Sequence, residues 1–311
     1  MSRVLITGAS GFIGSRIAIR AAQAGHEVIA TTRYVTHGLE TALNLPIQPL
    51  DVLDPTIATR DCAADVIVHC ATANDTLSRN FAAGVELSVN GTRNILEMAV
   101  HNDIRNVLFF STLQVYGTEL QGTITESTIP RCESYYGLNH LMGEEVCRLY
   151  ASKYGLNTTL LRPSNVYGVP DTLMAKRSTL VPMCFVKTAL LTGRIVLQSS
   201  GLQKRNFISN DEVSDACLHL IGNPIQGAAV VNAASNWLAS INELAIMVKQ
   251  EYFRRKGTQI EIEYSSNVPS SGEDFFLKSR LDFLRSPPED SHKKMAAVIS
   301  NLWDYFASSS K

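Results

Sequence analysis

Short runs of apolar residues alternate with longer helical patterns through the first half of the chain. Each run is hydrophobic at nearly every position, which is typical of parallel strands that helices cover on both faces. The runs are Val4–Ile6, Val28–Ala30, Val66–Val68, Val107–Phe110 and Thr159–Leu161. Repeated strand–helix units of this kind predict an α/β fold around a doubly wound parallel sheet.

The stretches between these runs carry apolar residues at helical spacing. Ile13, Ile17 and Ala21 fall on one helical face, and residues 85–100 and 136–154 repeat the pattern. The second half of the chain is less regular. There we expect a helix near 184–191, a strand at 228–232 that returns to the main sheet, a helix from 241 to about 254, a strand at 258–264 and a last helix at 291–306.

Two parts follow from this division. Residues 1–165 form the predicted sheet domain, and residues 166–311 form a smaller C-terminal α/β lobe. Segments of that lobe, about 205–235, are expected to return to the core of the sheet domain. Ser240 and Glu243 fit a capping box at the start of one lobe helix.

The composition excludes several classes of protein. Charged residues make up 18% of the 311 positions and the net charge is −1, so no overall field favours nucleic acid or an acidic membrane. No apolar run approaches the length of a membrane span. The cysteines are scattered without a C-x-x-C pair, and the first strand begins at Arg3, so we expect a cytoplasmic protein with reduced thiols. The histidines show no metal-ligand spacing, and we expect no metal.

Glycines at three positions follow the first strand and precede the first helix. Gly8 permits the tight turn, Gly11 lets a diphosphate approach the backbone, and Gly14 allows the helix to pack closely on the strand. The helix N-terminus at Phe12 and Ile13 supplies free N–H groups and a positive dipole end for the anion. The strand–turn–helix context therefore favours a dinucleotide site and a Rossmann-type fold.

The end of the second strand favours one form of this cofactor. An acidic residue at that point would hold the ribose 2′-hydroxyl of NAD, but the chain has Arg33 there. A guanidinium suits a 2′-phosphate, so the sequence favours NADP(H) over NAD(H). The alternative is that Arg33 points into water.

Further segments carry a family resemblance. The turn Thr7–Gly14 resembles the fingerprint of the extended short-chain dehydrogenase/reductase family, whose members act on nucleotide-linked sugars. Six other segments between Arg3 and about Ala245 are similar to motifs of that family and follow in the same order. They are Asp51-Val52, His69–Thr72, Asn90–Thr92, Ser111–Gly117, Arg162–Gly168 and Arg205–Ile208.

The resemblance implies roles for single residues. Tyr136 would be the acid/base that moves a proton to or from a sugar oxygen, and Thr112 would hydrogen-bond the same oxygen. The diphosphate of a nucleotide sugar would be held by Asn165 and Arg205, with Arg280 as a further candidate. Cofactor contacts would come from Asp51, Val52, Cys70, Ala71, Thr72, Asn90 and Ser164. Each residue also has a structural alternative, such as a turn cap for Thr112 or a surface ion pair for Arg205.

One position departs from the family motif Tyr-x-x-x-Lys. The chain has His140 where the resemblance places the lysine, which binds the nicotinamide ribose and lowers the pKa of the tyrosine. An imidazole is mostly neutral at pH 7 unless a carboxylate supports it, and Glu144 lies one helical turn further along. Two hypotheses follow: His140 is a working replacement, which we favour, or the protein is an impaired cofactor-binding or sensing module.

The loop after Thr112 narrows the reaction. The family's 4,6-dehydratases have an Asp-Glu pair there and some reductase-epimerases a cysteine, whereas this chain has Leu113-Gln114. NADPH-dependent reduction of a 4-keto nucleotide sugar and 4-epimerisation remain, and Arg33 favours reduction. The resemblance also implies a homodimer through the helices at 85–100 and 136–154, with Leu141, Val146 and Leu149 on or near its interface. We expect a nucleotide sugar as the substrate.

Overall fold

Seven parallel strands form the main sheet. The computed structural model describes residues 1–172, 175, 179–265, 274–285 and 287–308. The strand order is β11-β7-β5-β4-β1-β2-β3, and the order reverses between β1 and β4, where a crevice opens at the carboxyl ends of the strands. The strands are β1 (Arg3–Thr7), β2 (Glu27–Thr32), β3 (Ile47–Pro49), β4 (Val66–His69), β5 (Asn106–Phe110), β7 (Asn157–Pro163) and β11 (Ala228–Ala233). The predicted Rossmann-type doubly wound sheet is therefore confirmed.

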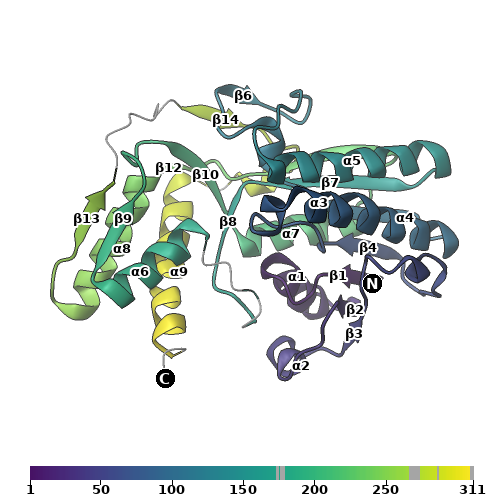
Figure 1. Ribbon diagram of the computed structural model, residues 1–311, viewed down its shortest axis with the longest axis horizontal. Coiled ribbons are helices and arrows are strands. Elements are labelled where there is room, and N and C mark those ends of the chain that lie inside the picture. The colour runs from purple at the N-terminus through teal and green to yellow at the C-terminus, as the bar shows by residue number, and fades with distance from the viewer. Residues whose placement is uncertain (173–174, 176–178, 266–273, 286, 309–311) are drawn as a thin grey trace.

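Helices cover both faces of this sheet (Figure 1). Alternate strand residues separate the faces: Val4 and Ile6 belong to one apolar cluster, and Leu5 belongs to the other. The first face packs against α1 (Phe12–Gln23) and α7 (Asn210–Gly222). The second face packs against α4 (Thr92–His101) and α5 (Tyr135–Tyr154). Helix α3 (Phe81–Val85) runs into α4 through a π-helical stretch, η3 (Glu86–Gly91).

The lobe is assembled from short strands and three helices. Its helices are α6 (Val181–Thr192), α8 (Ile241–Lys256) and α9 (Pro288–Ser308). Three small sheets pair β8 (Asn165–Tyr167), β10 (Lys204–Ser209) and β12 (Leu238–Ser240), then β9 (Arg194–Leu197) with β13 (Glu261–Tyr264), and β6 (Gly122–Ile124) with β14 (Phe275–Leu277). Short helical segments fill the remaining connections: α2 (Leu39–Leu43), η1 (Pro55–Thr59), η2 (Leu77–Arg79), η4 (Leu113–Tyr116) and η5 (Asp282–Leu284).

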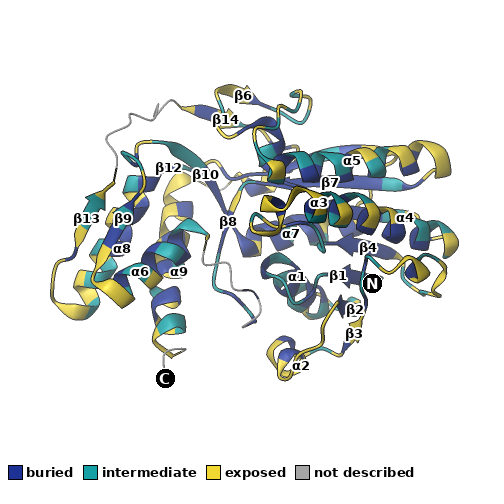
Figure 2. Ribbon diagram, in the orientation of Figure 1, coloured by how far each residue is buried: buried dark blue, intermediate teal, exposed yellow. Residues whose placement is uncertain are grey.

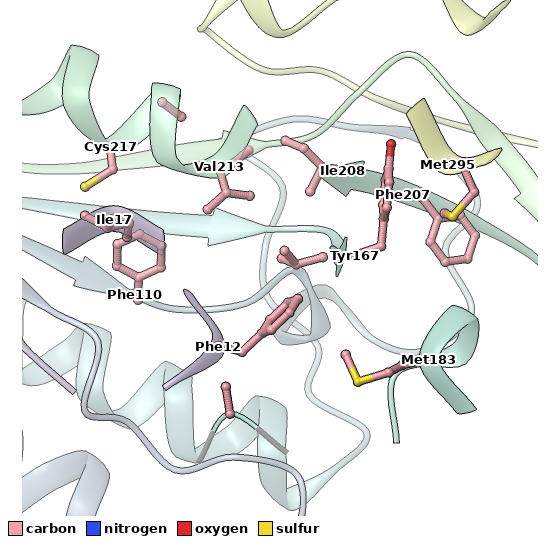
Figure 3. Packing of buried hydrophobic residues seen from close by; sticks show 14 of the residues in the cluster. Phe12, Ile17, Phe110, Tyr167, Met183, Phe207, Ile208, Val213, Cys217 and Met295 are labelled. Carbon is pink, nitrogen blue, oxygen red and sulfur yellow. The ribbon is translucent and has the colours of Figure 1, made fainter. Parts of the chain in front are cut away.

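A single apolar core joins the sheet domain to the lobe. Figure 3 shows Phe12 of the first helix close to Tyr167 and Met183, with Phe207 and Met295 continuing the packing into the lobe. Burial follows the same plan in Figure 2, where the strands of the main sheet are buried and exposed residues lie on the outer faces of α4 and α5. The lobe is thus packed firmly beside the carboxyl ends of the strands.

Several elements agree with the sequence predictions. The strand at 228–232 is β11, which joins the main sheet beside β7. The capping box at Ser240 and Glu243 is present, and a second one at Ser209 and Glu212 opens α7. Among the described residues, no helix is long and apolar enough to span a membrane.

Candidate active site

A cavity of about 410 Å³ lies at the carboxyl ends of the central strands, between the sheet and the lobe. Its volume falls within the usual range for small-molecule sites. It brings together most of the site residues predicted from the sequence: Gly8, Gly11, Phe12, Ile13, Gly14, Cys70, Thr72, Thr112, Tyr136, His140, Ser164, Asn165 and Arg205. The cavity is also lined by apolar residues that the sequence did not single out, namely Leu120 from the first half of the chain and Phe275 and Leu277 from the lobe.

The glycine turn has a geometry that other residues would break. Gly8 has φ +69°, and a Cβ there would lie 2.9 Å from the Ala71 nitrogen. A Cβ on Gly14 would lie 2.3 Å from the Gly8 carbonyl oxygen. At Gly11 the added carbon would meet only that same oxygen, at 3.1 Å, so its other side is open. The turn therefore exposes backbone where a diphosphate would bind, and the first N–H groups of α1 have no partner within the helix.

One further polar group faces this cavity. The Oγ atom of Ser164 is buried and has no hydrogen-bond partner among the residues that the structure describes. Ser164 lines the cavity beside the turn. Because a buried hydroxyl normally finds a partner, this atom fits a ligand that supplies one. The cradle of glycines and the Ser164 hydroxyl together fit a dinucleotide.

A buried histidine, His69, contacts the residue that precedes the glycine turn. His69 Nδ1 lies 2.7 Å from Thr7 Oγ1, and the Ala71 N–H donates to that same hydroxyl at 3.2 Å. Burial, together with the charge of nearby His140, lowers the pKa of His69 to about 3. The ring is therefore neutral in the folded protein and acts as a hydrogen-bonding spacer between β1 and β4. The sequence reasoning did not assign this role, although a histidine at the end of a buried strand was a visible signal.

The predicted catalytic residues lie on α5 and at the end of β5. Tyr136 is half-buried, and the centroid of its ring lies 4.6 Å from that of His140, edge to face. His140 is buried and donates through Nε2 to the Ala73 carbonyl at 3.1 Å. Thr112 caps η4, because its Oγ1 accepts from the Gln114 N–H at 3.2 Å. Thr112 therefore caps a turn, as the structural alternative had it, and also lines the cavity.

Glu144 is engaged by arginines. Its fully buried carboxylate accepts from Arg162 Nε at 2.7 Å, from Ser111 Oγ at 2.5 Å and from Arg148 at 3.2 Å. The guanidinium of Arg162 also stacks over the ring of Tyr116 at 4.7 Å. Glu144, the predicted partner of His140, therefore forms ion pairs with Arg162 and Arg148 and a hydrogen bond with Ser111, the residue before Thr112.

On the lobe side, two polar residues face the cavity. Burial lowers the pKa of Arg205, and Glu119 opposes this effect. Asn165 is exposed to the cavity and donates to the Asn206 carbonyl at 2.9 Å. An arginine that is largely out of water is suited to an anionic ligand such as a diphosphate.

The other predicted residues lie away from the cavity wall. Asp51 accepts from the Leu53 N–H at 3.1 Å, and Val52 is buried against Gly91. Asn90 is exposed on the π-helical stretch, and Ala71 braces the turn through its N–H as described above. Their contacts with a cofactor stay predictions.

Two predicted arginines also lie outside the cavity. Arg280 is exposed, and its backbone N–H donates to Glu126 at 2.8 Å. Arg33 is exposed as well, with its guanidinium 4.7 Å from the centroid of the Tyr34 ring. The alternative that Arg33 lies at the surface therefore describes its position in the structure.

Comparisons with known proteins agree with this geometry. A model of the NAD-dependent epimerase/dehydratase family matches residues 4–234. The chain is 30% identical to a putative UDP-glucose 4-epimerase of Methanocaldococcus jannaschii over 80% of the chain and 82% of the relative. It is 28% identical to a UDP-N-acetyl-α-D-glucosaminuronate decarboxylase of Bacillus cytotoxicus, over 80% of the chain and 79% of the relative.

Solved structures show the same fold. The UDP-glucuronic acid 4-epimerase of Bacillus cereus, solved in complex with NAD, matches with a TM-score of 0.82 and 21% identity, over 99% of this chain and all of the other. This neighbour and the NAD-dependent description of the matching family contradict the preference for NADP(H). The preference was wrong because it rested on Arg33, which stacks on Tyr34 at the surface instead of lining the cavity.

Proposed function

Because the chain belongs to the NAD-dependent epimerase/dehydratase family, we propose that it is a 4-epimerase of a nucleotide-linked sugar and works with bound NAD. One observation supports this most: a single cavity is lined by the glycine turn, by Thr112 and Tyr136, and by Arg205. These are a cofactor cradle, a proton-transfer pair and an anion-binding cation. The relative from Methanocaldococcus jannaschii, which is named as a putative UDP-glucose 4-epimerase, supports the same choice.

The glycine turn and Ser164 would hold the cofactor. The N–H groups at the start of α1 would bind the diphosphate, and the buried Ser164 hydroxyl would gain the partner that it lacks within the described residues. When bound, NAD supplies the oxidising and reducing equivalents at carbon 4, and the complete cycle leaves its redox state unchanged. Leu120, Phe275 and Leu277 line the other side of the cavity and would lie beside the bound substrate.

Tyr136 and Thr112 would act on the sugar. Tyr136 accepts the proton of the hydroxyl group on carbon 4 as that carbon becomes a ketone, and returns the proton after the ketone has presented its other face. Thr112 holds the same oxygen through its hydroxyl. Arg205 and Asn165 bind the diphosphate, so that the sugar can turn while the nucleotide stays in place.

His140 would take the place of the family's lysine. A tyrosine needs a nearby positive charge to act as a base near neutral pH. The His140 ring contacts the Tyr136 ring edge to face, and its Nε2 proton is fixed by the Ala73 carbonyl, so any further proton would be carried on Nδ1. We propose that the His140 ring positions Tyr136, and that activity depends more strongly on pH than it would with a lysine, because an imidazole is charged over only part of the neutral range.

Reduction of a 4-keto nucleotide sugar is the less supported reading. It was favoured because Arg33 suggested NADPH, and that premise does not hold. Dehydration remains disfavoured by Leu113-Gln114 in the loop after Thr112. A homodimer is part of the proposal but rests on the family resemblance: on α5, Leu149 is 59% exposed, whereas Leu141 and Val146 pack within the subunit.

The direct test is product analysis with a panel of nucleotide sugars. The native protein is incubated with NAD and UDP-glucose, UDP-glucuronate or UDP-N-acetylglucosamine, and NMR spectroscopy follows the carbon-4 epimers. We expect one epimer pair to interconvert without net NADH formation, and Tyr136→Phe to lower the rate about 100- to 10,000-fold while NAD binding is kept. The proposal would be contradicted if no sugar in the panel were epimerised and if, in a parallel assay with added NADH, a 4-keto nucleotide sugar were reduced with stoichiometric loss of NADH.

A further inference from the structure

Three residues of the C-terminal part contact the start of the cofactor site. Thr172 Oγ1 donates to the Ser10 carbonyl at 2.9 Å, and Asn210 Nδ2 donates to the Phe12 carbonyl at 2.7 Å. Asp171 forms an ion pair with Arg16 of α1 at 2.8 Å. Ser10 belongs to the glycine turn and the other two partners to the first turns of α1. We call Asp171, Thr172 and Asn210 the lobe latch.

The lobe latch is buried rather than a set of surface contacts. Thr172 is 3% exposed and Asn210 is 2% exposed. The Asp171 side chain is 12% exposed, and its burial raises the pKa of the carboxyl group despite the nearby Arg16. Removing polar groups from water is unfavourable unless they are paired. The hydrogen bonds and the ion pair to the turn and α1 therefore offset the cost of burying the polar groups of the lobe latch.

The turn is held from two sides. On the sheet side, the Ala9 N–H donates to the Thr31 carbonyl at 2.9 Å, and the Ser10 hydroxyl bonds Thr32 at 2.7 Å. On the lobe side, Thr172 holds the Ser10 carbonyl. Thr172 fixes the Ser10–Gly11 peptide, whose N–H closes the turn on the Gly8 carbonyl at 2.9 Å. Asn210 fixes the Phe12–Ile13 peptide, whose N–H is among the first N–H groups of α1 that would bind the diphosphate. Only molecules whose turn already has the binding conformation can bind NAD, so the apparent affinity scales with the fraction of such molecules. Bonds that hold the turn in that conformation therefore raise the affinity for the cofactor.

The same segment borders the substrate side of the cavity. The Ala175 N–H donates to Thr172 Oγ1 at 3.1 Å, and Ala175 lines the cavity. Asn210 is in contact with Gly168, at the end of the segment that carries Ser164 and Asn165. Thr172 thus bonds both the cofactor turn and a residue of the substrate wall.

We propose that Thr172 and Asp171 are positioning residues that hold the glycine turn in its NAD-binding conformation from the lobe side. This inference rests on the proposed use of NAD. It makes retention of the cofactor depend on the lobe as well as on the sheet. Neither residue contacts the reacting atoms in this scheme; both act through Ser10 and Arg16.

Two matched pairs of variants test the proposal. Thr172→Val removes the hydroxyl and keeps the shape, whereas Thr172→Ser keeps the hydroxyl. Asp171→Asn weakens the ion pair with Arg16 beside the turn, whereas Asp215→Asn weakens the ion pair of Asp215 with Arg20, which lies one helical turn further along α1. The dissociation constant for NAD is measured by calorimetry on the full-length protein stripped of nucleotide, and melting temperatures are measured without NAD.

We expect Thr172→Val to weaken NAD binding about five- to tenfold, because the buried hydrogen bond to the Ser10 carbonyl is lost, and Thr172→Ser to restore binding to within about twofold. Asp171→Asn is expected to weaken binding more than Asp215→Asn, even where the two lower the melting temperature equally. Equal NAD affinity in the native protein, Thr172→Val and Asp171→Asn would overturn the latch and leave the proposed function standing. Absence of NAD binding by the native protein would overturn both.

Discussion

The sheet domain and the lobe contribute to the cavity in different ways. The sheet domain supplies the glycine turn, Thr112, Tyr136 and His140, all placed by consecutive strand–turn–helix units. The lobe supplies Arg205 from β10, whose partners β8 and β12 come from before and after it in the chain. Proton-transfer chemistry is therefore set by local structure, whereas the fit of the substrate depends on contacts between distant segments. Variants in the two regions should separate cofactor binding from substrate binding.

The largest expected effect is at Gly14 of the turn. A Cβ in Gly14→Ala would lie 2.3 Å from the Gly8 carbonyl oxygen, and because that oxygen belongs to the backbone, only a shift of the turn can relieve the contact. We expect NAD affinity to fall more than about 100-fold, since the diphosphate would lose its aligned N–H groups. Calorimetric titration with NAD measures this.

The matched control is Gly222→Ala at the end of α7, away from the turn. A Cβ there meets nothing within 4 Å, and alanine favours the helix by about 0.5–1 kcal/mol. NAD binding should be unchanged and the melting temperature unchanged or raised. Retention of full NAD affinity by Gly14→Ala would refute the assigned role of the turn.

Next in size is the effect of losing Arg205. Arg205→Gln removes a charge-assisted contact to the diphosphate, so we expect KM for the nucleotide sugar to rise about 10- to 100-fold with NAD affinity unchanged. Arg194→Gln is the control, because Arg194 forms an exposed pair with Glu263 elsewhere in the lobe. Steady-state kinetics measures both. A fall in kcat at constant KM would place Arg205 outside the diphosphate site.

A third prediction concerns stability in acid. The pKa of His69 is lowered to about 3 in the folded protein, below the ordinary value of about 6.5. Between these two pH values His69 is protonated in the unfolded chain but neutral in the folded protein. The stability that His69 contributes is complete above pH 6.5. It is lost as the pH falls toward 3, at about 1.4 kcal/mol per pH unit.

Urea unfolding between pH 7.5 and pH 5 measures this dependence. In His69→Asn the slope of the unfolding free energy against pH should fall by the contribution of one proton, about 1.4 kcal/mol per pH unit. His292→Asn, at an exposed lobe position, should leave the slope unchanged. An identical slope in His69→Asn and the native protein would show that His69 is not the buried neutral group that braces the turn.

The smallest expected effect is that of restoring the family's lysine. His140→Lys should raise activity above neutral pH several-fold, because an ammonium group stays charged where an imidazole loses its proton. A pH profile of kcat for both proteins measures this, and NAD affinity serves as the control. If only the lysine variant is active, the native chain is better explained as a cofactor-binding or sensing protein.

The contrast between the two regions also marks what could be predicted. The strands and helices of the sheet domain follow from apolar runs and helical spacing, and the cavity contains the predicted Thr112, Tyr136 and His140. Short strands such as β6 and β14 were missed, since each has three residues and its partner lies far away in the chain. Phe275 and Leu277 of β14 line the cavity, so the sequence pattern did not predict this part of the cavity wall.

Errors at single residues have equally physical causes. Arg33 suggested NADP(H) from its position after β2, but stacking on Tyr34 turns its side chain to the surface, which spacing along a chain does not reveal. Glu144 lies one turn from His140, yet two arginines from other positions take its carboxylate. Contacts of long charged side chains depend on the packing of neighbouring elements and are the least predictable part of such a site.

The most direct test of the proposed 4-epimerisation uses a nucleotide sugar that carries deuterium on carbon 4. The substrate is the sugar found to be converted in the panel, and mass spectrometry with NMR locates the label after incubation with the native protein and NAD. We predict an epimer that keeps the deuterium on carbon 4, because the same bound cofactor serves both halves of the cycle. Accumulation of the label in free reduced cofactor, with an oxidised sugar as the product, would contradict the proposal.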